Sequence, residues 1–303
     1  MKDYNFNRLG DEIKHWSKQL GFTMVGIAKM DAEQTVISCA MNYLPNCDES
    51  LHISRYALGR DYHKVMHKRL KKLVIKINNN IGDFNYRCFV DNIKILEKHL
   101  AIQAGLGWQG KNSLIINRRH GSWMFLGEIV TDLQLPIDVP YNGNYCGNCT
   151  RCINACPTGA ILDNCKIDIN RCISYLTIEH RGLIPEELRP LMGNHIYGCD
   201  DCQLVCPWNR FAKVTLEPNF YVRHNLDSAD LITLFAWSEQ EFLSKTQGSA
   251  IRRIGYECWL RNIAVALGNA PKNPKIIAAL KARLKHPSAL VTEHVKWALQ
   301  LLM

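Results

Sequence analysis

The sequence predicts an α+β protein in three parts, and three observations lead to this division. Helical and strand-like hydrophobic periods alternate over 1–139, cysteines gather within 140–209, and short amphipathic helices separated by prolines occupy 210–303. The first part is interpreted as an α/β-type catalytic domain, the second as a ferredoxin-like insert and the third as a helical tail. A chain of 303 residues, 47% of them hydrophobic, is long enough for two or three packed units.

The first part is expected to contain three helices and five strands. Apolar residues recur at helical spacing over 9–20, and Gly21 ends this first helix. A second helix begins at Asp61 and carries a basic face opposite its apolar face, and a third covers 95–104. The basic face consists of Lys64, Lys68, Arg69, Lys71, Lys72 and Lys76. The strands are expected at 22–28, 35–41, 85–90, 113–117 and 123–131.

The tail is expected to form three amphipathic helices, at 250–268, 275–285 and 291–303. Paired short helices of this kind suggest a small α-solenoid of HEAT type, of which about one and a half repeats are recognisable. Such a shape suits an extended partner.

Two cysteine runs carry the most specific signal. The first, C-x2-C-x2-C-x3-C-P, begins at Cys146, and the second, C-x2-C-x3-C-P, begins at Cys199. In two-cluster ferredoxins the cysteine before proline serves the other cluster. One 4Fe–4S cluster is therefore expected on Cys146, Cys149, Cys152 and Cys206. The second is expected on Cys156, Cys199, Cys202 and either Cys172 or Cys165, with Cys172 preferred because it begins a predicted buried helix.

Zinc is the main alternative, because four-cysteine zinc sites also use paired C-x2-4-C runs. The x2, x2, x3, Pro spacing, repeated in shortened form, is difficult to explain in that way. Disulfides fit less well, since the thiols crowd into close runs and nothing marks the protein as secreted. The chain is therefore expected to transfer single electrons.

Composition and charge bound the setting in which this chemistry occurs. The N-terminus has no apolar signal core, and no stretch approaches the roughly 18 apolar residues of a membrane helix. We expect a soluble, cytoplasmic monomer. The formal net charge is +9, which two clusters of roughly −2 each reduce to about +5. A basic surface suits a polyanion such as nucleic acid, although many basic proteins bind none.

The electron acceptor is expected in the first part, which lacks the G-x-G-x-x-G fingerprint of a nicotinamide site. The Gly-rich segment 105–111 would let a bulky, flat cofactor approach the backbone, or it is an ordinary helix-to-strand loop. Asp91 follows a predicted strand, where an acid is well placed to face an active site. Held protonated by desolvation, it would be a proton donor; alternatively it caps the following helix.

Five segments together resemble the epoxyqueuosine reductase family. They are RCFVDNIKILE (87–97), AGLGWQGKN (104–112), GSWMFLGE (121–128), YGCDDCQLVCPWN (197–209) and AIRRIGYECWLRNIAVALGN (250–269). This resemblance implies a cobalamin-dependent enzyme, related to reductive dehalogenases, that removes the epoxide oxygen of epoxyqueuosine at the wobble position of tRNA to give queuosine. It also implies that two 4Fe–4S clusters, supplied by an external low-potential donor, pass electrons to cobalt.

The resemblance also assigns residues. Asp91 matches the family's proposed proton donor. Implied cobalamin contacts are Ser54, Arg55, Asp91, Gly107, Trp108, Lys111 and Ser122. We expect the basic helix face within 64–76, together with Arg252, Arg253 and Arg261, to contact tRNA phosphates, because phosphate contacts position a nucleic acid while base contacts specify it. The alternative for the helix face is simple solvation.

Two departures from the family pattern are visible. Lys94 stands where the family usually has proline, which changes the loop after Asp91 but leaves the acid. About forty residues that relatives carry between the strands at 22–28 and 35–41 are also missing, which affects the expected corrin contacts. Two other functions remain: a reductive dehalogenase acting on a small organohalide, and a pure electron carrier with an appended interaction domain.

Overall fold

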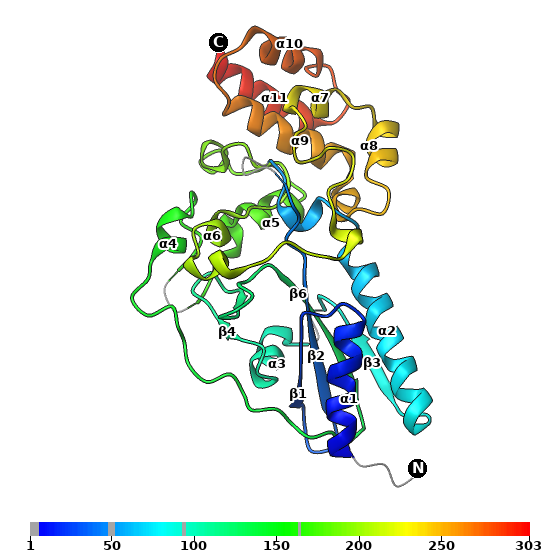
Figure 1. The fold of residues 1–303 in the computed structure, drawn as a ribbon. Coiled ribbons are helices and arrows are strands. Elements are labelled where there is room, and N and C mark those ends of the chain that lie inside the picture. Colours follow the sequence, from blue (N-terminus) through cyan, green and yellow to red (C-terminus); the bar gives the residue numbers. More distant parts are fainter. Residues whose placement is uncertain (1–5, 48–51, 93–94, 163–164) are drawn as a thin grey trace. The chain divides into compact units, whose positions relative to one another are not determined.

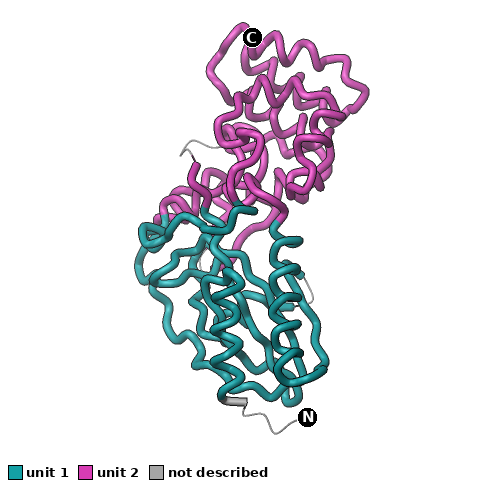
Figure 2. Tube along the Cα trace, turned by 45° about the vertical axis from the view of Figure 1, so that its right-hand side comes forward, with its two compact units in different colours: residues 1–44, 62–150, 206–220 teal, residues 45–61, 151–205, 221–303 magenta. Residues whose placement is uncertain are grey.

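The structure, a computed structural model, describes residues 6–47, 52–92, 95–162 and 165–303 (Figure 1). Two compact units are built from segments far apart in sequence. Unit 1 combines the described parts of 1–44, 62–150 and 206–220, and unit 2 those of 45–61, 151–205 and 221–303 (Figure 2). The cysteine-rich segment is thus shared between the two units, which cut across the three predicted parts of the chain.

Unit 1 contains a four-stranded sheet in the order β1-β2-β6-β3. Its strands are β1 (Met24–Lys29), β2 (Thr35–Asn42), β6 (Met124–Thr131) and β3 (Tyr86–Phe89), close to the predicted positions. All three pairings are antiparallel, so the expectation of an α/β-type domain is wrong while α+β is confirmed. Here the alternation of helices and strands arises because helices cover both faces of an antiparallel sheet.

The helices of unit 1 divide between the two faces of the sheet. On one face, α1 (Phe6–Gln19) packs against β1, and α2 (Tyr62–Ile81) packs against β3 and β6. A Cβ added to Gly127 in β6 would lie 2.9 Å from the Met66 Cε atom of α2. Because side chains alternate along a strand, the next residue, Glu128, points to the opposite face. That face is covered by α3 (Glu97–Gln103), which contacts β1, β2 and β6.

A two-stranded ladder of β4 (Trp108–Gln109) and β5 (Ile115–Ile116) follows α3. Gly107, immediately before β4, is needed for the protein's own packing, because a Cβ at this position would lie 2.2 Å from the Ile116 carbonyl oxygen. A close approach to the backbone of the Gly-rich segment therefore occurs as predicted, but the group that approaches Gly107 is strand β5 of the same chain.

Unit 2 is mainly helical. Its cysteine-rich part contains α4 (Arg151–Ala155), α5 (Ile173–Ile178) and α6 (Asp201–Leu204). Its tail contains α7 (Leu231–Ala236), α8 (Glu239–Lys245), α9 (Gly255–Gly268), α10 (Pro274–Ala282) and α11 (Ala289–Leu302). Short 3₁₀ helices in the two units cover Arg55–Ala57, Ile169–Arg171, Pro190–Met192, Pro207–Phe211, Pro218–Phe220 and Ala250–Ile254.

The buried helix α9 organises the tail by packing against α7 and α11. The predicted helices at 275–285 and 291–303 are confirmed as α10 and α11. The predicted helix at 250–268 begins instead as a 3₁₀ turn, because Gly255, with φ 78°, interrupts it before α9. In the part of the chain that the structure describes, no helix combines the length and apolar character that crossing a bilayer requires.

Candidate functional site

Three cysteines of unit 2, Cys172, Cys152 and Cys156, lie near Cys202 in α6. Burial, followed by the neighbouring Cys172 thiol, raises the pKa of Cys202, and Cys152 and Cys156 contribute in the same direction. Thiols in such surroundings keep their protons unless a metal centre replaces them. Cys172 therefore lies where a ligand of the second cluster is needed, which supports its preference over Cys165.

Three of the four cysteines expected on the first cluster, Cys146, Cys149 and Cys206, lie in unit 1 and form a second group, whereas the fourth, Cys152, belongs to unit 2. Cys206 lies near Cys146 and Cys149, and its sulfur accepts the backbone N–H groups of Trp208 and Asn209. Hydrogen bonds to sulfur are among the features that tune iron–sulfur clusters. The cysteine before Pro207 thus lies beside the first run, as the exchange rule requires.

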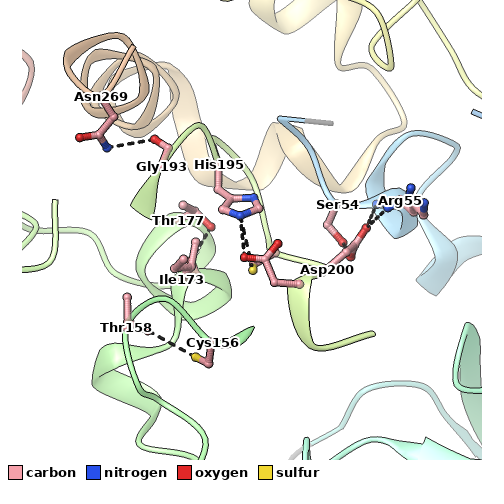
Figure 3. Close-up of polar contacts among 12 residues, drawn as sticks. Ser54, Arg55, Cys156, Thr158, Ile173, Thr177, Gly193, His195, Asp200 and Asn269 are labelled. Atoms are coloured by element: carbon pink, nitrogen blue, oxygen red, sulfur yellow. Dashed lines mark hydrogen bonds and ion pairs between the residues drawn. The ribbon is translucent and has the colours of Figure 1, made fainter. Parts of the chain in front are cut away.

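An imidazole that sequence reasoning missed lies beside the second run. His195 Nε2 is 3.1 Å from Asp201 Oδ2 and 3.7 Å from Cys199 Sγ (Figure 3). These three side chains are of metal-ligating types, and their ligand atoms lie within 4.8 Å of one another. Because Cys199 is expected on a cluster, we interpret His195 as a neighbour of a cluster thiolate. Its position four residues before Cys199 was the available signal.

Ser54 and Arg55, implied as cobalamin contacts, hold Asp200 within unit 2. Ser54 Oγ lies 2.5 Å from Asp200 Oδ1, while the Arg55 backbone N–H and guanidinium donate to Oδ2 over 2.9 and 3.3 Å (Figure 3). Burial raises the pKa of Asp200, and these hydrogen bonds oppose the shift. Both side chains are buried, and their hydrogen bonds to Asp200 fix the segment between Cys199 and Cys202.

Asp91 follows β3 and has a left-handed backbone, with φ 51°. The N-cap of α3 is Leu96, so the alternative that Asp91 caps this helix is wrong. The strand-end argument was also unsound, since it holds for parallel sheets and this sheet is antiparallel. What marks the position is the set of groups around the Asp91 carboxylate.

Two side chains from the first turn of α2 meet this carboxylate. Tyr62 Oη donates to Asp91 Oδ2 over 2.5 Å, and His63 Nε2 lies 3.5 Å from the same oxygen. The Tyr62 ring stacks on Phe125, with centroids 4.1 Å apart and planes within 5°. The Asp91 side chain is 59% exposed, so the described residues do not supply the desolvation expected for it.

Strand β4 and the loop that follows it each carry a buried donor without a partner among the described residues. The Trp108 ring nitrogen and the Asn112 amide nitrogen are buried and make no hydrogen bond within the described ranges. Trp108 packs against Tyr145 and Trp208, each with centroids 5.2 Å away. Buried donors normally have acceptors, so the β4–β5 ladder and its loop are suited to a polar ligand.

Two further implied cofactor residues connect this region to the cysteine runs. Lys111 Nζ donates to the Cys149 carbonyl oxygen over 3.0 Å. The Ser122 backbone N–H donates to Asn209 Oδ1 over 2.7 Å. Within unit 1, therefore, the segments that carry Lys111 and Ser122 lie beside those that carry Cys149 and Cys206.

The basic residues predicted to bind tRNA differ in exposure. Arg261 is fully buried, and its guanidinium donates to three backbone carbonyl oxygens, so its prediction as a phosphate contact is wrong. The acceptors are His180 O, Gly182 O and Leu176 O, at 2.7, 2.9 and 2.8 Å. Arg252 is exposed, whereas the Arg253 side chain, 39% exposed, pairs with Glu179 at 3.1 Å.

The two departures from the family pattern have different outcomes. Lys94 lies outside the described residues. The shortened connection between β1 and β2 is a turn over 30–34, with the Met30 N–H donating to the Gln34 carbonyl oxygen over 3.0 Å. The two strands are therefore directly joined as an antiparallel hairpin.

Comparison with known families gives two matches. The family described as "Epoxyqueuosine reductase QueG, DUF1730" matches residues 28–92, and the "4Fe-4S double cluster binding domain" matches 145–209. Proteins named epoxyqueuosine reductase from Pseudomonas aeruginosa and Escherichia coli are 47% and 48% identical to this chain, in both cases over 97% of it. The matches cover 94% and 90% of those relatives. The alignments run over 340 and 343 residues, so the relatives carry segments that this chain of 303 residues lacks.

Solved structures agree with this similarity. An epoxyqueuosine reductase crystallised with an epoxyqueuosine-modified tRNA-Tyr stem loop has a TM-score of 0.89 at 26% identity, over 98% of this chain and 91% of that one. The enzyme from Streptococcus thermophilus has a TM-score of 0.86 at 27% identity, over 96% and 89%. The reductive dehalogenase NpRdhA, at 17% identity and a TM-score of 0.50 over 70% and 33%, shares the fold alone.

Proposed function

This chain belongs to the epoxyqueuosine reductase family, and we propose that it reduces epoxyqueuosine to queuosine at the wobble position of tRNA, the last step of queuosine biosynthesis. The observation that carries the proposal is the 47% identity to a named reductase over 97% of this chain and 94% of the relative. The reaction opens the epoxide and leaves a carbon–carbon double bond. It consumes two electrons and two protons and releases the oxygen as water.

The electrons would enter through the two cysteine groups. The match over 145–209 to a double-cluster domain supports two 4Fe–4S clusters, on the eight cysteines assigned from their spacing. The first cluster would take Cys146, Cys149, Cys152 and Cys206. The second would take Cys156, Cys172, Cys199 and Cys202. An external low-potential donor would reduce them one electron at a time.

Cobalamin is the proposed acceptor of these electrons, and unit 1 offers residues that fit it. The Trp108 and Asn112 donors, which lack partners in the part of the chain that the structure describes, would provide hydrogen bonds for a large polar ligand. Lys111 and Ser122 lie beside the segments of Cys149 and Cys206, where a redox cofactor would receive electrons. When bound, cobalamin would supply a strongly reducing cobalt centre for the reduction of the epoxide. Ser54, Arg55 and Gly107 remain proposed contacts by resemblance.

Asp91 is the proposed source of the proton for the departing oxygen. Its carboxylate accepts a hydrogen bond of 2.5 Å from the Tyr62 hydroxyl and lies 3.5 Å from His63 Nε2. These two groups orient the carboxylate and offer a route by which its proton is replaced. Because the Asp91 side chain is exposed in the protein alone, the bound cofactor and nucleoside would provide the desolvation that favours its protonated form.

Exposed basic side chains would bind the tRNA. Arg252 and Arg253 begin the segment before α9, and Lys64, Lys68, Lys71 and Lys72 are exposed on α2. We propose that α7–α11 act as a HEAT-like platform for an extended RNA, and that the enzyme works as a cytoplasmic monomer. The relative that was crystallised with a tRNA stem loop supports tRNA as the partner.

The direct test is turnover in vitro. Protein with reconstituted clusters and cobalamin, supplied with a low-potential reductant, should convert epoxyqueuosine in tRNA to queuosine. A reductive dehalogenase would leave the tRNA unchanged and reduce an organohalide. A pure electron carrier would give neither turnover nor a corrin absorption band after reconstitution. Either result would overturn the proposal.

A further inference from the structure

Asp91 adopts a backbone conformation that needs support. Its φ of 51° is in the left-handed region, which most residues with a Cβ disfavour. Tyr62 and His63 contact the Asp91 side chain and do not restrain its backbone N–H. Strained residues of this kind persist only where the surroundings determine them. Contacts to the backbone of this turn therefore bear on where the Asp91 carboxylate lies.

Glu97, the first residue of α3, meets this backbone. Its Oε1 accepts the Asn92 backbone N–H over 3.2 Å, and its carboxylate also accepts the N–H of Asp91. Successive N–H groups next to a left-handed residue form a concavity that favours an anion. A single carboxylate thus closes the turn that carries Asp91.

The surroundings of Glu97 make its charge depend on pH near neutrality. Burial, opposed by the two backbone hydrogen bonds and supplemented by the Asp91 charge, raises the pKa of Glu97 to about 7. The other titratable groups that face it are His63 on α2, Lys98 on α3 and Glu128 on β6. Glu128 is fully buried on the sheet face that α3 covers. Glu97 is therefore ionised in only part of the molecules near neutral pH.

We propose that Glu97 is a positioning residue for the reaction, whose ionised carboxylate holds Asp91 in its left-handed conformation and releases it when protonated. This proposal rests on the proposed function only in taking Asp91 as the proton donor. The contact itself belongs to the protein without substrate and can be measured there.

The first experiment measures hydrogen–deuterium exchange of the backbone amides of Asp91 and Asn92 in the cluster-loaded protein. Glu97→Ala should accelerate this exchange about tenfold, the usual effect of losing one hydrogen bond to a charged acceptor. Glu97→Gln, which retains an acceptor oxygen, should give a smaller increase. The control is Glu239→Ala, which removes the first glutamate of α8 and should leave the exchange unchanged.

The second experiment varies pH. After correction for intrinsic exchange rates, wild-type protection of Asp91 and Asn92 should fall as pH decreases from 8 to 6, because protonation removes the anionic acceptor. Protection in Glu97→Gln should not depend on pH in this range. Wild-type protection that is independent of pH, or exchange in Glu97→Ala equal to wild type, would overturn the proposal.

Turnover separates this inference from the proposed function. With epoxyqueuosine-containing tRNA, Glu97→Gln should lower kcat several-fold and leave KM and cobalamin content unchanged. Wild-type protein that protects these amides but does not reduce epoxyqueuosine would contradict the proposed function alone. Normal kcat in a Glu97→Gln protein whose amides exchange faster would show that the contact does not serve catalysis.

Discussion

The Tyr62 hydroxyl donates a hydrogen bond to Asp91 Oδ2 over 2.5 Å and joins the first turn of α2 to the residue that follows β3. The Tyr62 ring is fixed by its stack on Phe125 of β6, so the hydroxyl position is set by the sheet. The proposed acid is thereby located by a helix and two strands, and not by its own loop alone.

Tyr62→Phe should keep the stack and remove the hydrogen bond. We expect kcat to fall about tenfold, since hydrogen bonds to charged groups contribute roughly 1.5–3 kcal/mol, while the unfolding midpoint changes little. Single-turnover reduction of epoxyqueuosine measures this effect. Tyr86→Phe is the control, because it also removes a tyrosine hydroxyl, in this case from β3. Equal rates for Tyr62→Phe and Tyr86→Phe would mean that the hydroxyl has no part in proton transfer.

Cluster ligation is tested by iron content. Cys172→Ala should lose about half of the bound iron, because one of the two clusters loses a ligand. Cys165→Ala should lose almost none. Cys39, Cys47, Cys88 and Cys258 should be equally dispensable. Iron analysis with electron paramagnetic resonance of the reduced proteins distinguishes the two clusters. If Cys165→Ala lost the iron and Cys172→Ala kept it, Cys165 would be the ligand of the second cluster.

Salt dependence tests the proposed tRNA contacts. Replacing Arg252 and Arg253 together by alanine should weaken tRNA binding and reduce the slope of log K against log salt by about 0.7–0.9 for each phosphate that the protein no longer neutralises. Iron and cobalamin content should stay normal. Glu179→Gln is the matched control, because it removes the ion-pair partner of Arg253 and keeps both positive charges. An unchanged slope in the double variant would assign these arginines to packing within unit 2.

The protonation of Glu128 should make the free energy of unfolding depend on pH. Burial, followed by the charge of Glu97, raises the pKa of Glu128 well above its ordinary value, and its Oε2 has no partner among the described residues. Between the pKa of the unfolded chain and the raised pKa of the folded state, the folded protein keeps a proton that the unfolded chain releases, so stability falls as pH rises through this window, by up to about 1.4 kcal/mol per unit.

Glu128→Gln should remove this dependence. Its unfolding midpoint should exceed that of wild type increasingly from pH 6 to pH 8, measured with clusters in place. The exposed Glu33→Gln should follow wild type throughout. Parallel wild-type and Glu128→Gln curves would mean that Glu128 is ionised in the folded state.

Local features of this chain were predictable from its sequence. The cysteine runs depend on spacing alone, and the strand before Asp91 depends on a period of a few residues. By contrast, Tyr62 and Asp91 meet through the order of strands in the sheet, which periodicity does not encode. The helices α7 and α8 were missed because six and seven residues are too few for a clear helical period.

Arg261 illustrates the same limit for charge. An arginine in an amphipathic run is normally expected at the surface, but this one is enclosed by carbonyl groups 79 to 85 residues away in sequence. Five hydrogen bonds, three to backbone oxygens and two to Asn262 Oδ1, satisfy its guanidinium. A residue's charge therefore predicts its need for partners, while only the fold decides whether they are phosphates or carbonyls.

The most direct test of the central claim is nucleoside analysis of tRNA from the source strain after deletion of the coding sequence. We predict that epoxyqueuosine accumulates and queuosine disappears. The wild-type sequence supplied in trans should restore queuosine. Asp91→Asn, which preserves the size of the side chain but lowers turnover by roughly 10²-fold or more, should leave most of the epoxide in place. Normal queuosine and no epoxyqueuosine in the deletion strain would contradict the account.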